Sequence, residues 1–152
     1  MSKVKTSQKL NILITGAGAP GISGTIYSLK KNFDNREIII IGTDAKKNVV
    51  GKFLCDRFYV IPPVKNVKNY LKTLIKICKD ENVNVLIPQN TMELSILSSN
   101  QNKFNKVGTK VLLASKKSID LANDKFLLMQ TCNNLGVPVG NFFKVNNFSD
   151  LI

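Results

Sequence analysis

Three glycines directly follow an apolar run, at a spacing that occurs in ligand-binding turns. Gly16, Gly18 and Gly21 follow the pattern G-x-G-x-x-G. In such turns the first glycine permits a tight bend, the second lets the backbone approach a ligand, and the third lets a helix pack on a strand. The same turn also occurs for packing alone, so the spacing leaves open a ligand-binding turn and a structural one.

A carboxylate and a polar turn follow two other apolar runs. Asp44 comes after the run Ile38–Ile41, and the turn Pro88–Thr91, which includes Asn90, comes after another apolar segment. Because the carboxyl ends of parallel strands meet at one edge of a sheet, we expect Asp44 and this turn to surround one crevice with the glycines. Asp44 could bind a ribose hydroxyl, contact a substrate amine or cap the next turn, and we favour capping or substrate contact.

The composition limits the chemistry that this chain can perform. Its 152 residues contain no histidine, which excludes Ser-His-Asp and Cys-His catalysis and zinc sites that need imidazole. Cys55, Cys78 and Cys132 lie far apart without metal-ligand spacing, and we interpret them as reduced core residues. Any mechanism must therefore use backbone amides, lysines, carboxylates or a bound metal.

The net charge of +12 raises the question of a nucleic-acid partner. The lysines are dispersed as short pairs such as Lys46-Lys47, and no basic helix carries interleaved aromatics, so we expect a solvated lysine surface and no nucleic-acid partner. No apolar run approaches the ~20 residues of a membrane span, and no signal peptide precedes the first strand. We therefore expect a soluble, cytoplasmic protein without a membrane partner.

Alternating apolar runs and helical periodicities predict the elements that position these residues. A first strand leads into the glycine turn, and a helix begins at Pro20 or Gly21, with Ile22, Ile26, Leu29 and Phe33 covering the sheet. Four further strands are predicted at 37–42, 58–61, 83–87 and 110–114, with helices at 67–78 and 91–104. This alternation predicts an α/β fold, a doubly wound, Rossmann-like parallel sheet of five strands in the order 3-2-1-4-5 with helices on both faces.

The pattern changes from Ser115 onward. We expect a short helix through Leu121, a second helix that Gly136 ends, a new strand at 141–145 and a helix start at 149–152. The predicted organisation is a disordered leader at 1–9, a Rossmann-like domain at 10–122, and a linker helix with the start of a truncated further domain at 123–152. We expect the chain to be a fragment of a longer protein.

Five segments together carry a resemblance to a known family. They are Leu13–Gly18, Ile41–Asp44, Asp56–Pro62, Asn123–Lys125 and Gly136–Pro138. In this order they resemble the N-terminal, pre-ATP-grasp part of ATP-grasp ligases, most closely those similar to the carbamoyl phosphate synthase large subunit.

The resemblance implies a chemistry and two cofactors. Family members activate a carboxylate with ATP and form an acyl phosphate, which an amine or similar nucleophile attacks. ATP and Mg²⁺ would bind to sequence beyond Ile152, so the fragment alone would be inactive, with small-molecule carboxylates and amines as the partners of the full-length protein. Lys125 matches a lysine or arginine that reaches the nucleotide phosphates, although a helix-start lysine can also pair with a surface carboxylate.

The resemblance also implies roles around the crevice. Gly16, Ala17, Gly18 and Gly21 would form a wall of the acceptor-substrate site, with their amides as an anion-binding rim, or a structural turn. Glu93 matches a glutamate of a Glu-Leu pair that starts a helix and closes the crevice. Asp44, Pro88 and Asn90 would complete the substrate contacts, although relatives often have an acidic residue near Thr91 that this chain lacks.

Two other functions fit parts of the sequence. An NAD(P)-binding oxidoreductase domain would explain the glycine turn and Asp44, but Tyr27 and Lys31 lie on the first helix, where they cannot act over a nicotinamide. A non-enzymatic binding module would predict neither ATP dependence nor a ligand in the crevice.

Overall fold

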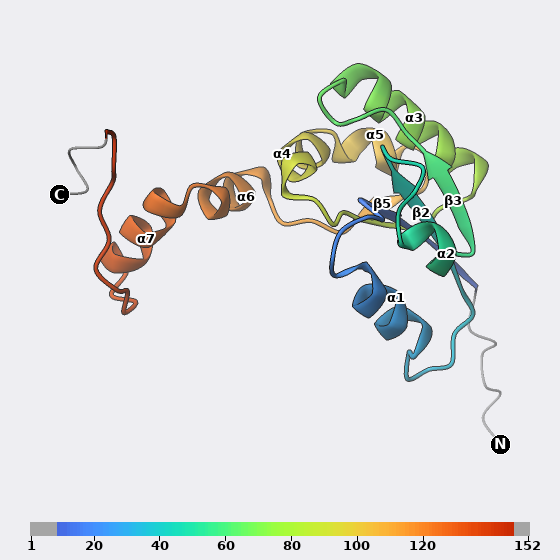
Figure 1. The fold of residues 1–152 in the computed structure, drawn as a ribbon, viewed down its shortest axis with the longest axis horizontal. Helices are drawn as coiled ribbons and strands as arrows, with labels where there is room; N and C mark the ends of the chain where they lie inside the picture. The colour runs from blue at the N-terminus through green and yellow to red at the C-terminus, as the bar shows by residue number, and fades with distance from the viewer. Residues whose placement is uncertain (1–8, 148–152) are drawn as a thin grey trace. The chain divides into compact units, whose positions relative to one another are not determined.

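The computed structural model describes residues 9–147 of the chain. The predicted leader, apart from Lys9, and the predicted helix start at 149–152 lie outside the described residues. The chain divides into two compact units, the first ending at Leu113 and the second beginning at Ala114 (Figure 1).

The first unit is built on a parallel sheet of five strands in the order β3-β2-β1-β4-β5, which confirms the predicted topology. The strands are β1 Leu10–Thr15, β2 Ile38–Asp44, β3 Arg57–Val60, β4 Val85–Ile87 and β5 Lys110–Val111. The central strands β1 and β2 are almost continuously apolar because helices cover both of their faces.

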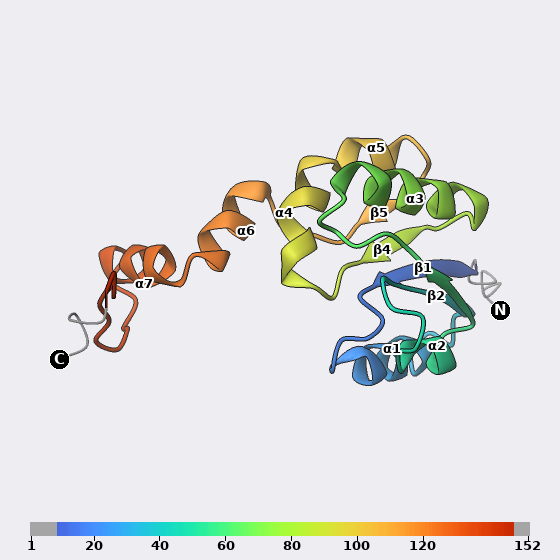
Figure 2. The same cartoon turned by 45° about the horizontal axis from the view of Figure 1, so that its top comes forward.

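Helices lie on the two faces of this sheet, as Figure 2 shows. One face carries α1 Ile22–Lys30 and α2 Gly51–Leu54; the other carries α3 Val67–Asp80, α4 Thr91–Ser99 and α5 Gln101–Asn105. Strand residues alternate between the two cores. Ile12 and Ile14 pack with α1, whereas Leu13 packs with the core of α3, α4 and α5.

The helices differ from the sequence prediction in two places. The helix predicted at 91–104 is interrupted at Asn100, whose Nδ2 donates to the Ile96 carbonyl at 2.8 Å and ends α4. Helix α1 ends at Lys30, because Asn32 donates to the Leu29 carbonyl at 3.0 Å and turns the chain. Phe33 is consequently 99% exposed and does not cover the sheet as predicted.

Asp56 holds the start of the edge strand β3 against β2. Its backbone N–H donates to the Ile40 carbonyl at 2.9 Å, and its Oδ2 accepts from the Ile40 N–H at 2.8 Å. Lys30 Nζ lies 3.0 Å from Oδ1 of the same carboxylate. The Asp56 side chain therefore takes the place of a backbone acceptor and extends the strand pairing by one position.

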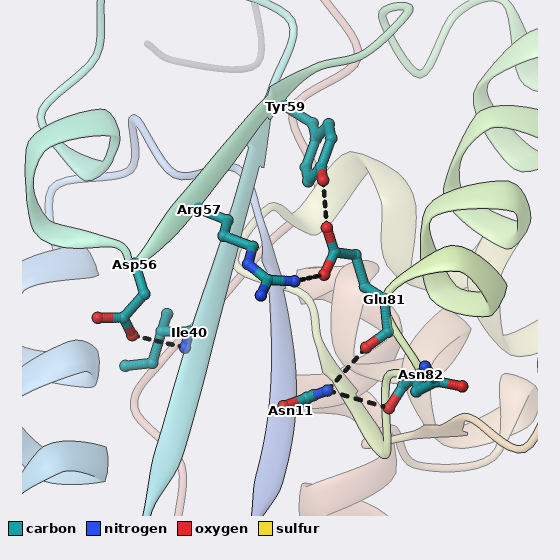
Figure 3. A network of polar contacts seen from close by, with 7 residues as sticks. All are labelled: Asn11, Ile40, Asp56, Arg57, Tyr59, Glu81 and Asn82. Carbon is teal, nitrogen blue, oxygen red and sulfur yellow. Dashed lines mark hydrogen bonds and ion pairs between the residues drawn. The ribbon is translucent and has the colours of Figure 1, made fainter.

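Two alternate residues of β3 reach the end of α3 on the same face of the sheet (Figure 3). Arg57 Nη1 and the Tyr59 hydroxyl both donate to the carboxylate of Glu81, which is 8% exposed. The hydrogen bond to this carboxylate raises the pKa of the Tyr59 phenol. Asn11 Nδ2 adds a contact from β1 to the Glu81 carbonyl at 2.7 Å. The segment Asp56–Pro62 therefore contains residues that anchor an edge strand.

The second unit contains two capped helices, α6 Lys116–Asn123 and α7 Lys125–Asn134. Asp124 caps α7 by accepting from the Leu127 N–H at 2.9 Å. Gly136, at φ +73°, follows the helix as predicted, and the Val137 N–H donates back to the Cys132 carbonyl at 3.0 Å.

The strand predicted at 141–145 is wrong, because these residues are irregular. A strand needs a neighbouring strand to pair with its backbone, and the described part of the second unit contains none. The Phe142 ring instead packs edge-on against Phe126 of α7, with 5.6 Å between centroids. None of the helices at 9–147 has the length and apolar character needed to span a membrane.

Acid should weaken the contribution of Asp56 to stability. Burial opposes ionisation of this carboxyl, but the Ile40 amide and the Lys30 ammonium outweigh it and lower the pKa. Because the pKa of this carboxyl is lower in the folded chain than in the unfolded chain, its ionised form stabilises the fold at pH values above the unfolded pKa of about 4. This stabilisation is lost as the pH falls through the folded-state pKa. We expect Asp56→Asn to destabilise the chain more at pH 6 than at pH 3 in urea unfolding. Asp80→Asn, which breaks an exposed pair with Lys76, is the control, and an equal Asp56→Asn effect at both pH values would contradict this account.

Close packing at α2 predicts opposite effects for two glycine substitutions. A Cβ on Gly51 would lie 2.4 Å from the Ala17 carbonyl oxygen, so α2 would have to move away from the glycine turn. We expect Gly51→Ala to destabilise the chain by about 1–3 kcal/mol. Gly24→Ala, in open space within α1, should stabilise it by about 0.5–1 kcal/mol. Thermal unfolding of both variants checks this, and a Gly51→Ala chain as stable as Gly24→Ala would refute the close contact.

Candidate functional site

Two adjoining hollows open beyond the carboxyl ends of β1, β2 and β4 in the first unit. The large lobe, of about 960 Å³, lies between the glycine turn, α2 and the turn after β4. The small lobe, of about 230 Å³, is bounded by the loop after β3 and by Tyr70 and Glu93. Gly16, Asp44 and Asn90 border both lobes. This is where the strand order reverses, the usual place for a ligand in such sheets.

The structure brings five of the residues singled out in the sequence to this cleft. Gly16, Gly18, Asp44 and Asn90 line the large lobe, and Glu93 lines the small one. They come from the ends of three different strands, so their convergence follows from the strand order that the sequence predicted.

Ala17, Gly21 and Pro88 border neither lobe. Ala17 is fully buried, and its carbonyl accepts from the Gly51 N–H at 3.0 Å. A Cβ on Gly21 would meet nothing within 4 Å, so this glycine does not serve close packing of α1 on the sheet. Gly21 instead precedes the first residue of the helix, and Ile22 makes the buried contact.

Gly16 is the residue on which the turn depends. Its φ of +61° lies in the left-handed region, which residues with a Cβ rarely adopt. A Cβ at this position would also lie 3.5 Å from Cβ of Asn90. The turn after β1 therefore lies against the turn after β4 with room for a Cβ, and the positive φ of the bend is what requires glycine here.

Three consecutive amides of the glycine turn, those of Ala17, Gly18 and Ala19, already have partners within the protein. The Ala17 N–H donates to the Thr43 carbonyl at 3.0 Å, and the Ala19 N–H donates to the Gly16 carbonyl at 2.8 Å. The Gly18 N–H donates to Oδ2 of Asp44 at 2.8 Å. These three amides do not form the open anion-binding rim that the resemblance implied, and the Asp44 charge disfavours a phosphate at this place.

Asp44 caps two turns at once. Besides the Gly18 amide on Oδ2, its Oδ1 accepts from the Lys46 backbone N–H at 2.9 Å. Both carboxylate oxygens therefore bind backbone amides, and the capping alternative describes the observed contacts of Asp44.

Glu93 is a buried carboxylate at the beginning of α4. It is 3% exposed and accepts hydrogen bonds from the Thr15 hydroxyl, the Tyr70 hydroxyl and, at 3.1 Å, the Asn90 N–H. The Asn90 side chain accepts in return from the Met92 N–H at 3.0 Å, which completes a capping box. Burial, and then the neighbouring Glu93 charge, raise the pKa of the Tyr70 phenol. Glu93 therefore joins α4 to β1 and α3.

The sequence analysis missed the lobe-lining residues at the start of α2 and within it, and two lysines. Val50 and Phe53 line the large lobe although they are 61% and 81% exposed. Lys46 lines the large lobe and Lys65 the small one. The pair Val49-Val50, followed three residues later by Phe53, was the signal available for an apolar wall beyond β2.

Lys125 belongs to the second unit. It is the first residue of α7, it is exposed, and its Nζ donates to the Ala122 carbonyl at 2.9 Å. Within residues 9–147 no three His, Cys, Asp or Glu side chains come together in a way that could hold a metal ion.

Loss of the Tyr70 hydroxyl should reveal the strength of the buried cluster. Tyr70→Phe removes a donor to a buried charge and is expected to cost about 1–3 kcal/mol in urea unfolding. Tyr27→Phe, at a position 66% exposed, should have no measurable effect. Combining Tyr70→Phe with Glu93→Gln should cost less than the sum of the single changes, because the two groups share one interaction. Additive effects would show that the hydrogen bond between Tyr70 and Glu93 contributes nothing to the free energy of unfolding.

The comparisons with known proteins agree with this fold. The family model described as "PylC-like, N-terminal domain" matches residues 12–112. A search of curated proteins gave no significant match.

Solved structures share the fold at low sequence identity. N5-carboxyaminoimidazole synthetase from Staphylococcus aureus, solved with ADP, is 16% identical with a TM-score of 0.61, covering 96% of this chain and 36% of that one. The biotin carboxylase subunit of a pyruvate carboxylase is 17% identical with a TM-score of 0.57, covering 85% and 28%. Pyruvate carboxylase from Rhizobium etli is 17% identical with a TM-score of 0.55, covering 88% and 13%.

The chain thus spans between 13% and 36% of the length of these three neighbours. Its strand order and helices match the N-terminal domains of ATP-grasp enzymes, as the resemblance had implied. Because the family model covers the sheet almost from β1 to the end of β5, the chain belongs to the PylC-like N-terminal domain family of ATP-grasp ligases.

Proposed function

We propose that this chain is the substrate-side part of an ATP-dependent carboxylate ligase that forms an acyl phosphate, as in enzymes similar to carbamoyl phosphate synthase. The observation that carries the proposal is the cleft at the strand-order reversal, in a chain whose family is that of ATP-grasp N-terminal domains. The cleft offers side chains from α2 and the strand ends to a small molecule, while the amides of Ala17, Gly18 and Ala19 are satisfied internally.

ATP and Mg²⁺ would bind mainly outside this chain. The described residues offer no cluster of metal-ligating side chains, and the glycine turn carries a carboxylate where a phosphate would need a donor. When bound, ATP would supply the phosphoryl group that activates the carboxylate. This chain would contribute the walls of the substrate cleft and Lys125, and it would be inactive alone.

Lys125 is proposed to reach the nucleotide phosphates. A cation at the first residue of a helix lies at the positive end of the helix dipole, so its charge does not serve the stability of α7. Its only described polar contact is the exposed one to the Ala122 carbonyl, and no carboxylate pairs with it within residues 9–147. Such an ammonium can exchange that carbonyl for a phosphate oxygen.

The NAD(P)-binding alternative receives less support. In a dinucleotide site the amides at the helix start face the pyrophosphate, whereas here the Gly18 amide binds the Asp44 carboxylate. Neither Tyr27 nor Lys31 borders the cleft. No observation favours a purely non-enzymatic module over a ligase domain.

The full-length protein tests the proposal. We expect ADP formation that depends on a carboxylate substrate and an amine, and we expect Lys125→Ala to weaken ATP use by about 1–3 kcal/mol, or roughly 5–150-fold in kcat/KM for ATP. Lys103→Ala, on the exposed surface of α5, is the matched control. Unchanged nucleotide kinetics in Lys125→Ala would return this residue to a surface role. ATP-independent behaviour of the whole protein would overturn the proposal itself.

A further inference from the structure

The charged groups of the cleft fall into two kinds. Asp44 and Glu93 are turned toward protein donors, with each Asp44 oxygen on a backbone amide and Glu93 held by two hydroxyls and an amide. Lys46 and Lys65 are exposed, and in the described part of the chain no hydrogen bond or ion pair engages either ammonium. The charges free to approach a ligand are therefore positive.

The carboxylates are also the harder groups for a ligand to reach. Glu93 is 3% exposed, so a ligand ammonium would have to displace the Tyr70 or Thr15 hydroxyl to contact it. An ammonium at Asp44 would compete with the amides that hold the glycine turn to β2. A ligand anion at Lys46 or Lys65 would displace only water.

The large lobe has an apolar wall opposite its polar residues. Val50, which precedes α2, and Phe53 and Leu54 of α2 expose 61%, 81% and 37% of their surface and line the lobe. Three apolar side chains exposed to one hollow can shield the apolar body of a ligand. The Gly51 contact with Ala17 fixes this wall to the glycine turn, so it is built into the fold.

We infer that the cleft binds a small carboxylate with an apolar or aromatic body, with the carboxylate at Lys46 or Lys65 and the body against Val50 and Phe53. This inference rests on the proposed function, because it names the substrate class of that site. It departs from the alternative in which Asp44 contacts a substrate amine, because both Asp44 oxygens accept from backbone amides. The net charge of +12 also favours the approach of an anion over that of a cation.

Three probes, two of similar size and one without the ring, separate charge from apolar contact. They are 3-phenylpropionate, 2-phenylethylamine, which replaces the anion by a cation, and propionate, which lacks the ring. In ¹⁵N NMR titrations of the chain we expect saturable shifts with 3-phenylpropionate at the amides of Gly18, Val50 and Phe53. We expect at least about 5-fold weaker binding for each of the other two probes.

Variants locate the contacts. Lys46→Ala and Lys65→Ala combined should weaken 3-phenylpropionate binding about 5-fold, and Phe53→Ala by a similar factor. Lys47→Ala, the adjacent lysine that lines neither lobe, should leave binding unchanged. A spectrum that otherwise overlays that of the unaltered chain shows that each variant is folded.

Preference for 2-phenylethylamine, or 3-phenylpropionate binding unaffected by the lysine and Phe53 variants, would overturn the inference. Absence of saturable shifts with all three probes would overturn it as well. None of these outcomes depends on ATP, so failure here is distinct from failure of the ligase proposal, which the full-length nucleotide kinetics decide.

Discussion

The cleft depends on how polar groups at the carboxyl ends of the strands find hydrogen-bond partners. A buried or half-buried amide or hydroxyl without a partner costs about 1–3 kcal/mol, and parallel strands leave several such groups at one edge. Here two carboxylates accept the hydrogen bonds of these groups. Asp44 accepts from the amides of Gly18 and Lys46, and Glu93 accepts from Thr15, Tyr70 and the Asn90 amide.

This arrangement gives each wall of the cleft a separate task. The carboxylates hold the turns together, so the groups left for a ligand are the lysines, the neutral amide side chains and the apolar surface of α2. The same contacts explain how a glycine turn with the spacing of a dinucleotide site can serve a different chemistry. The spacing of the glycines determines the path of the backbone. The Gly18 amide can bind a phosphate only if it does not already donate to an acceptor within the protein, and here it donates to Asp44.

The sequence predicted the framework because the framework follows from local patterns. The run Ile38–Ile41 predicts a buried strand, and the amphipathic spacing of α3 predicts a helix. The alternation of strands and helices along the chain then specifies the strand order. The partners of Glu93 could not be predicted in this way, since Thr15 and Tyr70 lie 78 and 23 residues away. The spacing of Asn90 and Glu93 was a readable capping signal, but its burial depends on the packed fold.

The segment Asp56–Pro62 and the wall of α2 show two further limits. Alternation in β3 predicts that Arg57 and Tyr59 share a face, but their common acceptor Glu81 comes from the end of another helix. Helix α2 has four residues, too few for a periodic pattern, and its close approach to the glycine turn depends on the missing side chain of Gly51.

Hydrogen exchange at the Gly18 amide, with and without NAD⁺, tests most directly whether internal acceptors occupy the glycine turn. This account predicts an amide protected in the free chain, whose exchange rate NAD⁺ leaves unchanged. An amide that exchanges at the rate of an open backbone and becomes protected only when NAD⁺ is added would contradict it.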